Sequence, residues 1–315
     1  MFFELLALLA STLLYYLIYK YKKIISSKLN IYDIPDEKRK IHKKKTSSIG
    51  GILFFSSLLT YCILSIIFEK IQLSQTIIFI LLLAFIYFIV GLLDDSHNIG
   101  AYYKLFWLFC ITFGILYFEP NLVLQKLYFQ TGSFELSTNY LNILFTTLSI
   151  LLLTNALNLA DGINGLAVKI CFIWLLYTKF IIFQDNGIFG ASLLAILLII
   201  FFNIYFGKFF LGNAGVMLLS ALVSLIFIYG YNLRVLTDKI YVEEIFILFM
   251  VPGIDMFRLF LQRIKNKKDP FSADQNHLHH FLIKKYKLKT SLLIYLSLII
   301  FPILTYKTGI MSGIE

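Results

Sequence analysis

The sequence predicts an all-α, polytopic integral membrane protein with about ten transmembrane helices. Of its 315 residues, 59% are hydrophobic and only 15% are charged, against about half and about a quarter in soluble domains. The apolar residues form long blocks that are almost free of charge, such as 77–93 and 193–206. Because a helix needs roughly 20 mostly apolar residues to cross a hydrocarbon core of about 30 Å, such blocks indicate membrane spans.

Hydropathy places the individual spans along the whole chain, with no long polar domain between them. The predicted spans lie near residues 2–19, 50–68, 76–93, 104–118, 141–156, 166–183, 189–206, 214–231, 243–260 and 291–308. An even number of spans leaves both termini on the same side of the membrane. We therefore expect one membrane domain covering residues 1–315.

The positive charge is concentrated in two stretches that flank apolar blocks. The net charge is +10, and of the 28 Lys and Arg residues 10 lie within 20–45 and 9 within 258–289. Nucleic acid is one partner of basic proteins, but positive charge beside membrane spans is typical of cytoplasmic loops. Both termini are then outside the cytoplasm. The loops 20–49, 94–104, 155–166, 207–213 and 258–290 all face the cytoplasm and are predicted to form the active site.

Two adjacent carboxylates, Asp94 and Asp95, follow the apolar block 77–93. Charged groups are costly inside lipid, and adjacent like charges raise the pKa of one member unless a cation lies between them. A solvated helix end would also explain the pair. The functional interpretation is a site for a divalent metal ion or for proton transfer.

Amide and carboxylate side chains gather where the apolar block 141–156 ends. They are Asn155, Asn158, Asp161 and Asn164, with Gly162 and Gly165 between and after the last two. Asp-Gly and Asn-Gly are ordinary turn sequences, but a turn does not explain two amides on one face of the last helical turn of an apolar span. Amides, a carboxylate and glycines that permit close backbone approach suit a sugar or nucleotide.

Three of the five histidines, His277, His279 and His280, lie within four residues. Zinc is one ligand of such clusters, but no cysteine cluster completes a zinc site. Imidazoles that bind or orient a diphosphate are the alternative. The lysines at 265, 267 and 268 would add positive potential, unless they only face the membrane surface.

These motifs, together with others in the same order, resemble one family. The matching stretches are Arg39-Lys40-x-His42 with Gly50-Gly51, Asp94-Asp95 with Lys104, Asn155-x-x-Asn158-x-x-Asp161-Gly162-x-Asn164-Gly165-Leu166, Asp255 with Arg263, and Asp274-x-x-His277-Leu278-His279-His280. The chain resembles the polyprenyl-phosphate N-acetylhexosamine-1-phosphate transferases of glycosyltransferase family 4. It is more similar to the branch that primes O-antigen and teichoic-acid-type polymers than to the peptidoglycan branch.

The resemblance implies a reaction and its partners. N-acetylhexosamine-1-phosphate, by default GlcNAc-1-phosphate, would pass from a UDP-sugar to undecaprenyl phosphate with release of UMP, as the priming step of a cell-envelope polysaccharide. Mg²⁺ would be the cofactor, with Mn²⁺ as an alternative. The protein would lie among lipids of the bacterial inner membrane, with a homodimer as one assembly and no nucleic acid. Both substrates are anionic, so a cation and basic residues are needed to offset their repulsion.

The resemblance also assigns roles to residues. Asp94 and Asp95 would serve the metal and deprotonate the lipid phosphate, with Asn213 as a further metal ligand. The other predicted catalytic residues are Asp161, His277, His279 and His280. The predicted substrate-binding residues are Arg39, His42, Lys104, Asn155, Asn158, Asn164 (nearest the uracil) and Arg263.

The chain departs from the family pattern at three places. The Gly-Asp-x-Gly motif is Gly212-Asn213-Ala214-Gly215 here, and the neutral amide of Asn213 should weaken Mg²⁺ binding. An Asp-Arg pair is Asp274-Gln275, which removes a fixed cation, and Lys45 and Ser47 stand in place of two prolines. Only the first departure affects the chemistry directly.

Two other functions remain open on the sequence alone. Asn213 is compatible with a catalytically degenerate homologue that binds lipid phosphate or nucleotide sugar without turnover. Carboxylates in membrane segments also occur in ion-coupled transporters. A transporter predicts polar residues near the middle of spans, and here they lie at the predicted span ends.

Overall fold

The computed structural model describes residues 2–35, 45–70, 73–136, 138–181, 187–206, 209–234, 240–272 and 274–311, and they are mostly helical. A long helix overlaps each predicted span: α1 (Phe2–Lys20), α3 (Gly50–Ile67), α4 (Gln75–His97), α5 (Ala101–Phe118), α6 (Asn139–Ala160), α7 (Leu166–Ile181), α8 (Gly187–Phe206), α9 (Gly212–Arg234), α10 (Val242–Lys265) and α12 (Leu288–Met311). The shorter helices are α2 (Lys22–Lys28), the 3₁₀ helix η1 (Pro120–Leu122) and α11 (Leu278–Lys285).

Seven helices in the described residues are long and apolar enough to cross a membrane. They are α1, α3, α4, α5, α6, α9 and α12. Of the others, α7 has 16 residues, and α10 carries charges at both ends, from Glu243 to Lys265. The seven helices agree with a multi-pass membrane protein. The count of ten spans and the side of the termini stay predictions.

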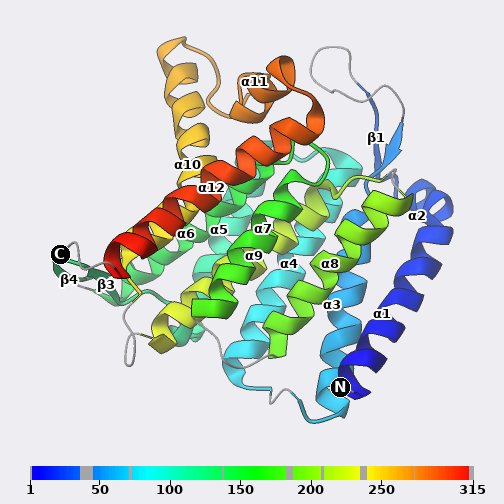
Figure 1. Ribbon diagram of the computed structural model, residues 1–315, viewed down its shortest axis with the longest axis horizontal. Helices are drawn as coiled ribbons and strands as arrows, with labels where there is room; N and C mark the ends of the chain where they lie inside the picture. The colour runs from blue at the N-terminus through cyan, green and yellow to red at the C-terminus, as the bar shows by residue number, and fades with distance from the viewer. Residues whose placement is uncertain are drawn as a thin grey trace.

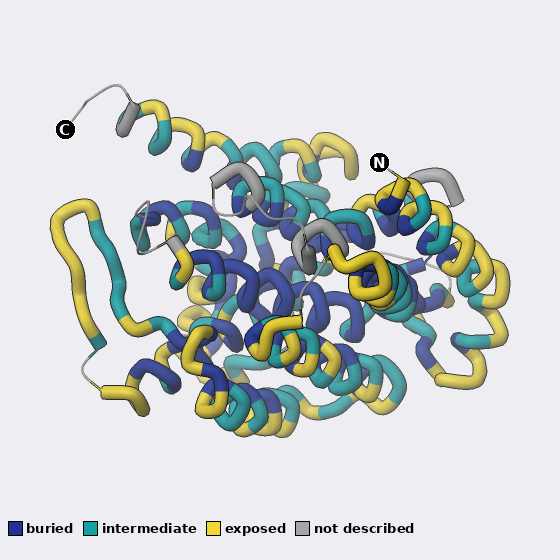
Figure 2. The backbone as a smooth tube through the Cα atoms, turned by 90° about the horizontal axis from the view of Figure 1, so that it is seen from below, coloured by how far each residue is buried: buried dark blue, intermediate teal, exposed yellow. Residues whose placement is uncertain are grey.

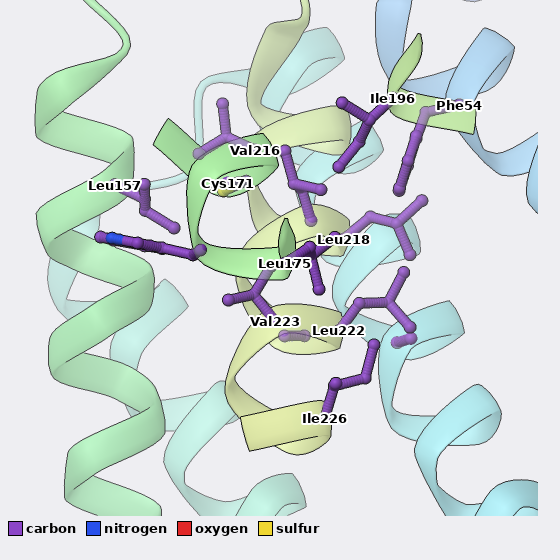
Figure 3. Packing of buried hydrophobic residues seen from close by; sticks show 14 of the residues in the cluster. Phe54, Leu157, Cys171, Leu175, Ile196, Val216, Leu218, Leu222, Val223 and Ile226 are labelled. Carbon is purple, nitrogen blue, oxygen red and sulfur yellow. The ribbon is translucent and has the colours of Figure 1, made fainter. Parts of the chain in front are cut away.

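Helix α9 forms the centre of the helical bundle. It packs against α3, α4, α6 and α7. In its apolar 18-residue stretch 94% of the residues are buried, compared with 17% in that of α5. Figure 3 shows Leu222 and Val223 of α9 beside Leu175 of α7 in this core. The buried residues lie in the middle of the molecule and the exposed ones on its outer helices (Figure 2), as expected when the outer apolar faces meet lipid.

Small residues let α3 and α4 approach α9 closely. A Cβ atom on Gly91 of α4 would lie 2.5 Å from the carbonyl oxygen of Asn213, and one on Gly51 of α3 would lie 2.7 Å from Cβ of Ala214. Helices without side chains at the contact can bring their backbones together. This contact fixes the beginning of α9 beside the end of α4, where the carboxylates lie.

Several helices continue beyond the ends that hydropathy predicts. Helix α4 extends to His97 and places Asp94 and Asp95 in its last turns, where Asn98 ends the helix in the left-handed conformation (φ 52°). Likewise α6 reaches Ala160 and α10 reaches Lys265. A hydropathy boundary falls at the first polar residue, but backbone hydrogen bonding can extend a helix past it.

Two small antiparallel sheets were not predicted. The strands β1 (Tyr32–Asp33) and β2 (Thr46–Ser47) pair with each other, and so do β3 (Lys126–Phe129) and β4 (Gly132–Glu135). Strands of two to four residues are too short for an alternating apolar pattern to reveal them. In Figure 1, β1 and α11 lie at one end of the bundle and β3–β4 lie away from it.

Candidate active site

A cavity of about 840 Å³ opens at the end of the bundle that carries β1 and α11. Among its lining residues are all the predicted site residues that the structure describes: Asp94, Asp95, Lys104, Asn155, Asn158, Asp161, Asn164, Asn213, Arg263, His277, His279 and His280. They come from four separate stretches of the chain. Arg39 and His42 lie outside the described residues.

Asp94 and Lys104 form an ion pair at the corner between α4 and α5. The Nζ atom of Lys104 lies 2.7 Å from Oδ2 of Asp94, and the Asp94 side chain is only 6% exposed. This ion pair holds the Asp94 carboxylate in place beside a positive charge. The pair therefore brings a positive charge and a proton acceptor to the same wall of the cavity.

Asp95 has a different role, because it caps α9. Its Oδ1 accepts a hydrogen bond from the backbone N–H of Asn213 (2.9 Å), and its Oδ2 accepts one from the N–H of Ala214 (3.0 Å). The first N–H groups of a helix lack partners within the helix and attract negative charge. Gly212, with φ 73°, makes the turn into α9. Asp95 thus fixes the backbone at Asn213.

The segment that leads into this turn is held by β2 and the start of α3. The N–H of Phe210 donates to the carbonyl of Ser47 (2.8 Å), and the N–H of Gly51 donates to that of Leu211 (2.8 Å). Phe210 and Ser48 line the cavity, and neither is among the predicted site residues. A phenylalanine beside an apolar block and a serine after a basic stretch are ordinary in a membrane protein, so neither carried a signal.

The end of α6 and the turn before α7 carry the amide side chains. Nδ2 of Asn155 lies 3.4 Å from the sulfur of Met256, and Nδ2 of Asn203 in α8 donates to Oδ1 of Asn164 (2.9 Å). Asn203 was missed, although an amide inside the apolar block 193–206 is itself a signal of a specific contact. It orients Asn164 at the edge of the cavity.

Asp161 ends α6 and faces the other carboxylates. Burial raises the pKa of the Asp161 carboxyl well above its usual range, and the nearby charge of Asp95 raises it further. A carboxyl of this kind is relieved by a proton or a cation. The cavity therefore favours a bound proton or a cation near Asp161.

The histidine segment is fastened to α10 by two side chains. Oδ2 of Asp255 accepts from Nδ1 of His277 (2.9 Å). Nε of Arg263 donates to Oδ2 of Asp274 (2.9 Å), and its Nη1 donates to the carbonyl of Pro270 (2.8 Å). Arg263, predicted as a substrate contact, lines the cavity and also holds this loop. Its Nη2 is buried without a partner in the described structure.

Asp274 is the acidic member of that loop contact. Burial alone would raise its pKa, but hydrogen bonds from the N–H of Asn276 and from Arg263 hold the pKa of the Asp274 carboxyl below its usual range. It stays ionised and paired at neutral pH. These bonds fasten the loop at Asp274, just before the histidine cluster.

The three histidine rings lie against one another. The rings of His277 and His279 are parallel with centroids 5.5 Å apart, and the centroids of His279 and His280 are 4.2 Å apart. Burial lowers the pKa of His279 to about 3, and the other two histidines contribute to this lowering. His279 is 1% exposed, and it is neutral at pH 7. It does not supply positive charge to a diphosphate.

Two comparisons with known proteins bear on this site. The sequence pattern described as glycosyl transferase family 4 matches residues 77–231. The predicted resemblance to family 4 is confirmed. The matched range holds the carboxylates of α4, the α6–α7 turn and Asn213.

Relatives of family 4 type cover most of the chain. One is "Probable undecaprenyl-phosphate N-acetylglucosaminyl 1-phosphate transferase" of Bacillus subtilis (strain 168), 27% identical over 270 residues, which are 83% of this chain and 72% of the relative. Another is "Undecaprenyl-phosphate alpha-N-acetylglucosaminyl 1-phosphate transferase" of Thermotoga maritima, 28% identical over 277 residues, covering 86% and 79%. A third is "Phospho-N-acetylmuramoyl-pentapeptide-transferase" of Petrotoga mobilis, 29% identical over 272 residues, covering 81% of each.

The oxygen donors of the cavity suit a hard divalent cation. Asp94, Asp95, Asp161 and Asn213 line it, and carboxylate and amide oxygens are the ligands that Mg²⁺ prefers. Among the described residues, no group of three His, Cys, Asp or Glu side chains is arranged to hold a metal ion. Mg²⁺ is usually held by one or two carboxylates together with water and substrate phosphates, so this donor set fits an ion that arrives with a nucleotide.

The neutral state of His279 predicts a pH dependence of stability. Its pKa is about 3 in the folded protein and 6.5 in the reference state. The unfolded chain therefore binds a proton that the folded chain does not, and stability falls as the pH drops from 6.5 towards 3. Thermal unfolding in detergent should show a lower Tm at pH 5 than at pH 7.5. In His279→Gln the drop should be smaller, and an equal drop would contradict the assignment.

Proposed function

We propose that the chain transfers N-acetylglucosamine-1-phosphate from UDP-N-acetylglucosamine to undecaprenyl phosphate in a bacterial cytoplasmic membrane. An oxygen of the lipid phosphate attacks the phosphorus that carries the sugar, and the bond between the two phosphates of the nucleotide breaks. UMP leaves with the electron pair. The product is a lipid-linked sugar diphosphate that primes a cell-envelope polysaccharide.

The observation that carries this proposal is the composition of the cavity wall. Charged and amide groups share the cavity with apolar side chains, namely Ile99, Leu105, Met256, Phe260, Phe271, Ile283 and Leu288. A ligand with an anionic head and an apolar chain, together with a polar nucleotide sugar, needs both kinds of wall. The names of the relatives in family 4 agree with this pair of substrates.

The residues of the chain divide the work by position. Lys104 offers a positive charge to the lipid phosphate beside Asp94, which accepts the proton of that phosphate. The amides at the end of α6 and Asn164 bind the nucleotide sugar, because amides both donate and accept hydrogen bonds at polar edges. His277 and His280 contact the diphosphate. Phosphoryl transfer mainly needs such positioning and charge stabilisation.

Mg²⁺, held by Asp94, Asp95 and Asn213, would supply positive charge that offsets the repulsion between the two anionic substrates. Asp161, which lines the same cavity, would be stabilised by the same positive charge. Lys104 and Arg263, which also line the cavity, add fixed positive charge.

The deciding experiment is a turnover assay with the purified protein in detergent. It contains a polyprenyl phosphate, Mg²⁺ and a panel of UDP-N-acetyl sugars, and it measures released UMP. Release with UDP-N-acetylglucosamine is the expected result. Absence of UMP with every sugar would exclude the transferase. Binding of UDP-sugar without turnover would then support the alternative that Asn213 raises, a homologue that binds but does not react.

The replacement Asn213→Asp tests the metal ligands. A carboxylate in place of the amide adds one negative charge to the oxygen donors and should strengthen Mg²⁺ binding. The Mg²⁺ concentration that gives half-maximal turnover should therefore fall, by about tenfold for each 1.4 kcal/mol of added binding free energy. Mg²⁺ titrations of both proteins measure it, together with Mg²⁺-induced shifts of Tm without substrates. An unchanged requirement would mean that residue 213 is not a ligand.

A further inference from the structure

Asp255 has no role in the reaction described so far, yet it makes the densest set of polar contacts near the histidines. It lies in α10 and is 8% exposed. One oxygen accepts from Nδ1 of His277 (2.9 Å), and the other accepts from Nη2 of Arg258 (2.8 Å). Both oxygens also lie within 3.2 Å of the backbone nitrogen of Leu278.

These contacts fix both the ring and the backbone that carries it. His277 is the residue before α11, and Leu278 is the first residue of that helix. A carboxylate that accepts from Leu278 satisfies one of the unpaired N–H groups at the helix start. Arg258 also donates to the carbonyl of Asn276. The chain on both sides of His277 is therefore fastened to α10, which runs up to the loop before α11 (Figure 1).

The bond to Asp255 decides which nitrogen of His277 is available. A carboxylate accepts a hydrogen bond and does not donate one at neutral pH, so Nδ1 must carry a proton. The remaining nitrogen, Nε2, is the one left for a ligand, and His277 lines the cavity. A neutral ring in another orientation would offer Nδ1 or turn away from the substrates.

We propose that Asp255 is a positioning residue of this enzyme, which orients His277 so that Nε2 meets the diphosphate of the nucleotide sugar. The expected effect of Asp255 on turnover rests on the proposed function. The expected tautomer and orientation of the His277 ring do not. Asp255 touches no substrate; it acts through His277, and Arg258 holds the chain beside that ring at the carbonyl of Asn276.

The test compares Asp255→Asn, Asp255→Glu, His277→Gln and the double variant Asp255→Asn with His277→Gln. The asparagine side chain in the first variant would have nearly the same shape, but its amide N–H₂ can face Nδ1 and favour the other tautomer. We expect kcat to fall by about 10- to 100-fold in Asp255→Asn, the range that a misplaced contact costs, with KM for the UDP-sugar close to wild type. Asp255→Glu should recover part of kcat. Glu135→Gln, on the exposed strand β4 away from the cavity, is the matched control.

The double variant separates positioning from general damage. If Asp255 acts through His277, removing both should cost no more than removing His277 alone, because residues that act as a unit are not additive. Additive losses, or an unchanged kcat in Asp255→Asn, would overturn the proposal.

A spectroscopic measurement keeps the two proposals distinguishable. ¹⁵N-histidine NMR of the wild type should show His277, assigned by its loss in His277→Gln, with the proton on Nδ1, and Asp255→Asn should change that pattern. If no sugar supports UMP release, the proposed function fails while the NMR result still decides the bond to Asp255. An unchanged His277 spectrum in Asp255→Asn would overturn the positioning role even in an active enzyme.

Discussion

Replacing Asp94 by asparagine should lower turnover by about 10²- to 10⁴-fold, the contribution of a positioned proton acceptor. Asp94 is buried and paired with Lys104 at 2.7 Å, so its charge is held at the cavity wall. The amide keeps the size of the side chain and an acceptor oxygen for Lys104, but it can neither take a proton nor offset a cation. UMP release at saturating substrates measures the loss of turnover in Asp94→Asn, and the Tm in detergent is measured alongside it.

Asp95→Asn is the comparison variant, because it separates a loss of chemistry from a loss of stability. The amide N–H₂ would face a backbone N–H of α9, where both Asp95 oxygens now accept hydrogen bonds. That variant should lower the Tm as well as activity, because a buried donor would be left unpaired. Glu135→Gln should leave both unchanged. Turnover close to wild type in Asp94→Asn would remove Asp94 from the proposed chemistry.

The membrane-spanning character of the chain follows from its sequence because it depends mainly on one property, the hydropathy of long stretches. Long apolar blocks bury themselves in lipid or in each other, and hydropathy measures this directly. The central place of α9 is not visible in the same way. Its block is no more apolar than that of α4, and its burial arises from Gly51, Gly91 and Gly215, which let neighbouring helices approach.

The site was partly predictable for a related reason. Asp94 and Asp161 are costly in an apolar chain, so their presence at or near span ends pointed to chemistry, and the clustering of His277 with two other histidines in one loop did the same. Their distinct tasks depend on partners that sequence spacing does not reveal. Asp95 accepts hydrogen bonds from two backbone N–H groups of a helix more than 100 residues later. His277 donates to Asp255 of the preceding helix.

His279 shows most clearly what the sequence could not predict about the site. In the sequence it is one of three neighbouring imidazoles, all of which were expected to bind or orient a diphosphate. In the fold it is enclosed between His277, His280 and the turn at Gly162. Burial without a hydrogen-bond partner in the described structure keeps it neutral. The charge state of a histidine depends on tertiary burial, which its neighbours in sequence do not determine.

Gly162→Ala should reduce turnover by on the order of 10²-fold, because it displaces that ring. A Cβ atom on Gly162 would overlap Nε2 of His279 and would lie 2.9 Å from its Cε1. The ring is confined by His277 and His280, so the histidine cluster or the Asp161 turn must shift. UMP release measures the loss.

Gly114→Ala is the matched control, because nothing lies within 4 Å of its added methyl group, and it should retain activity. If Gly162→Ala is as active as this control, the close contact between the turn and the histidine cluster does not support the reaction. A loss that His279→Ala partly restores, by making room for the methyl group, would identify the overlap itself as the cause.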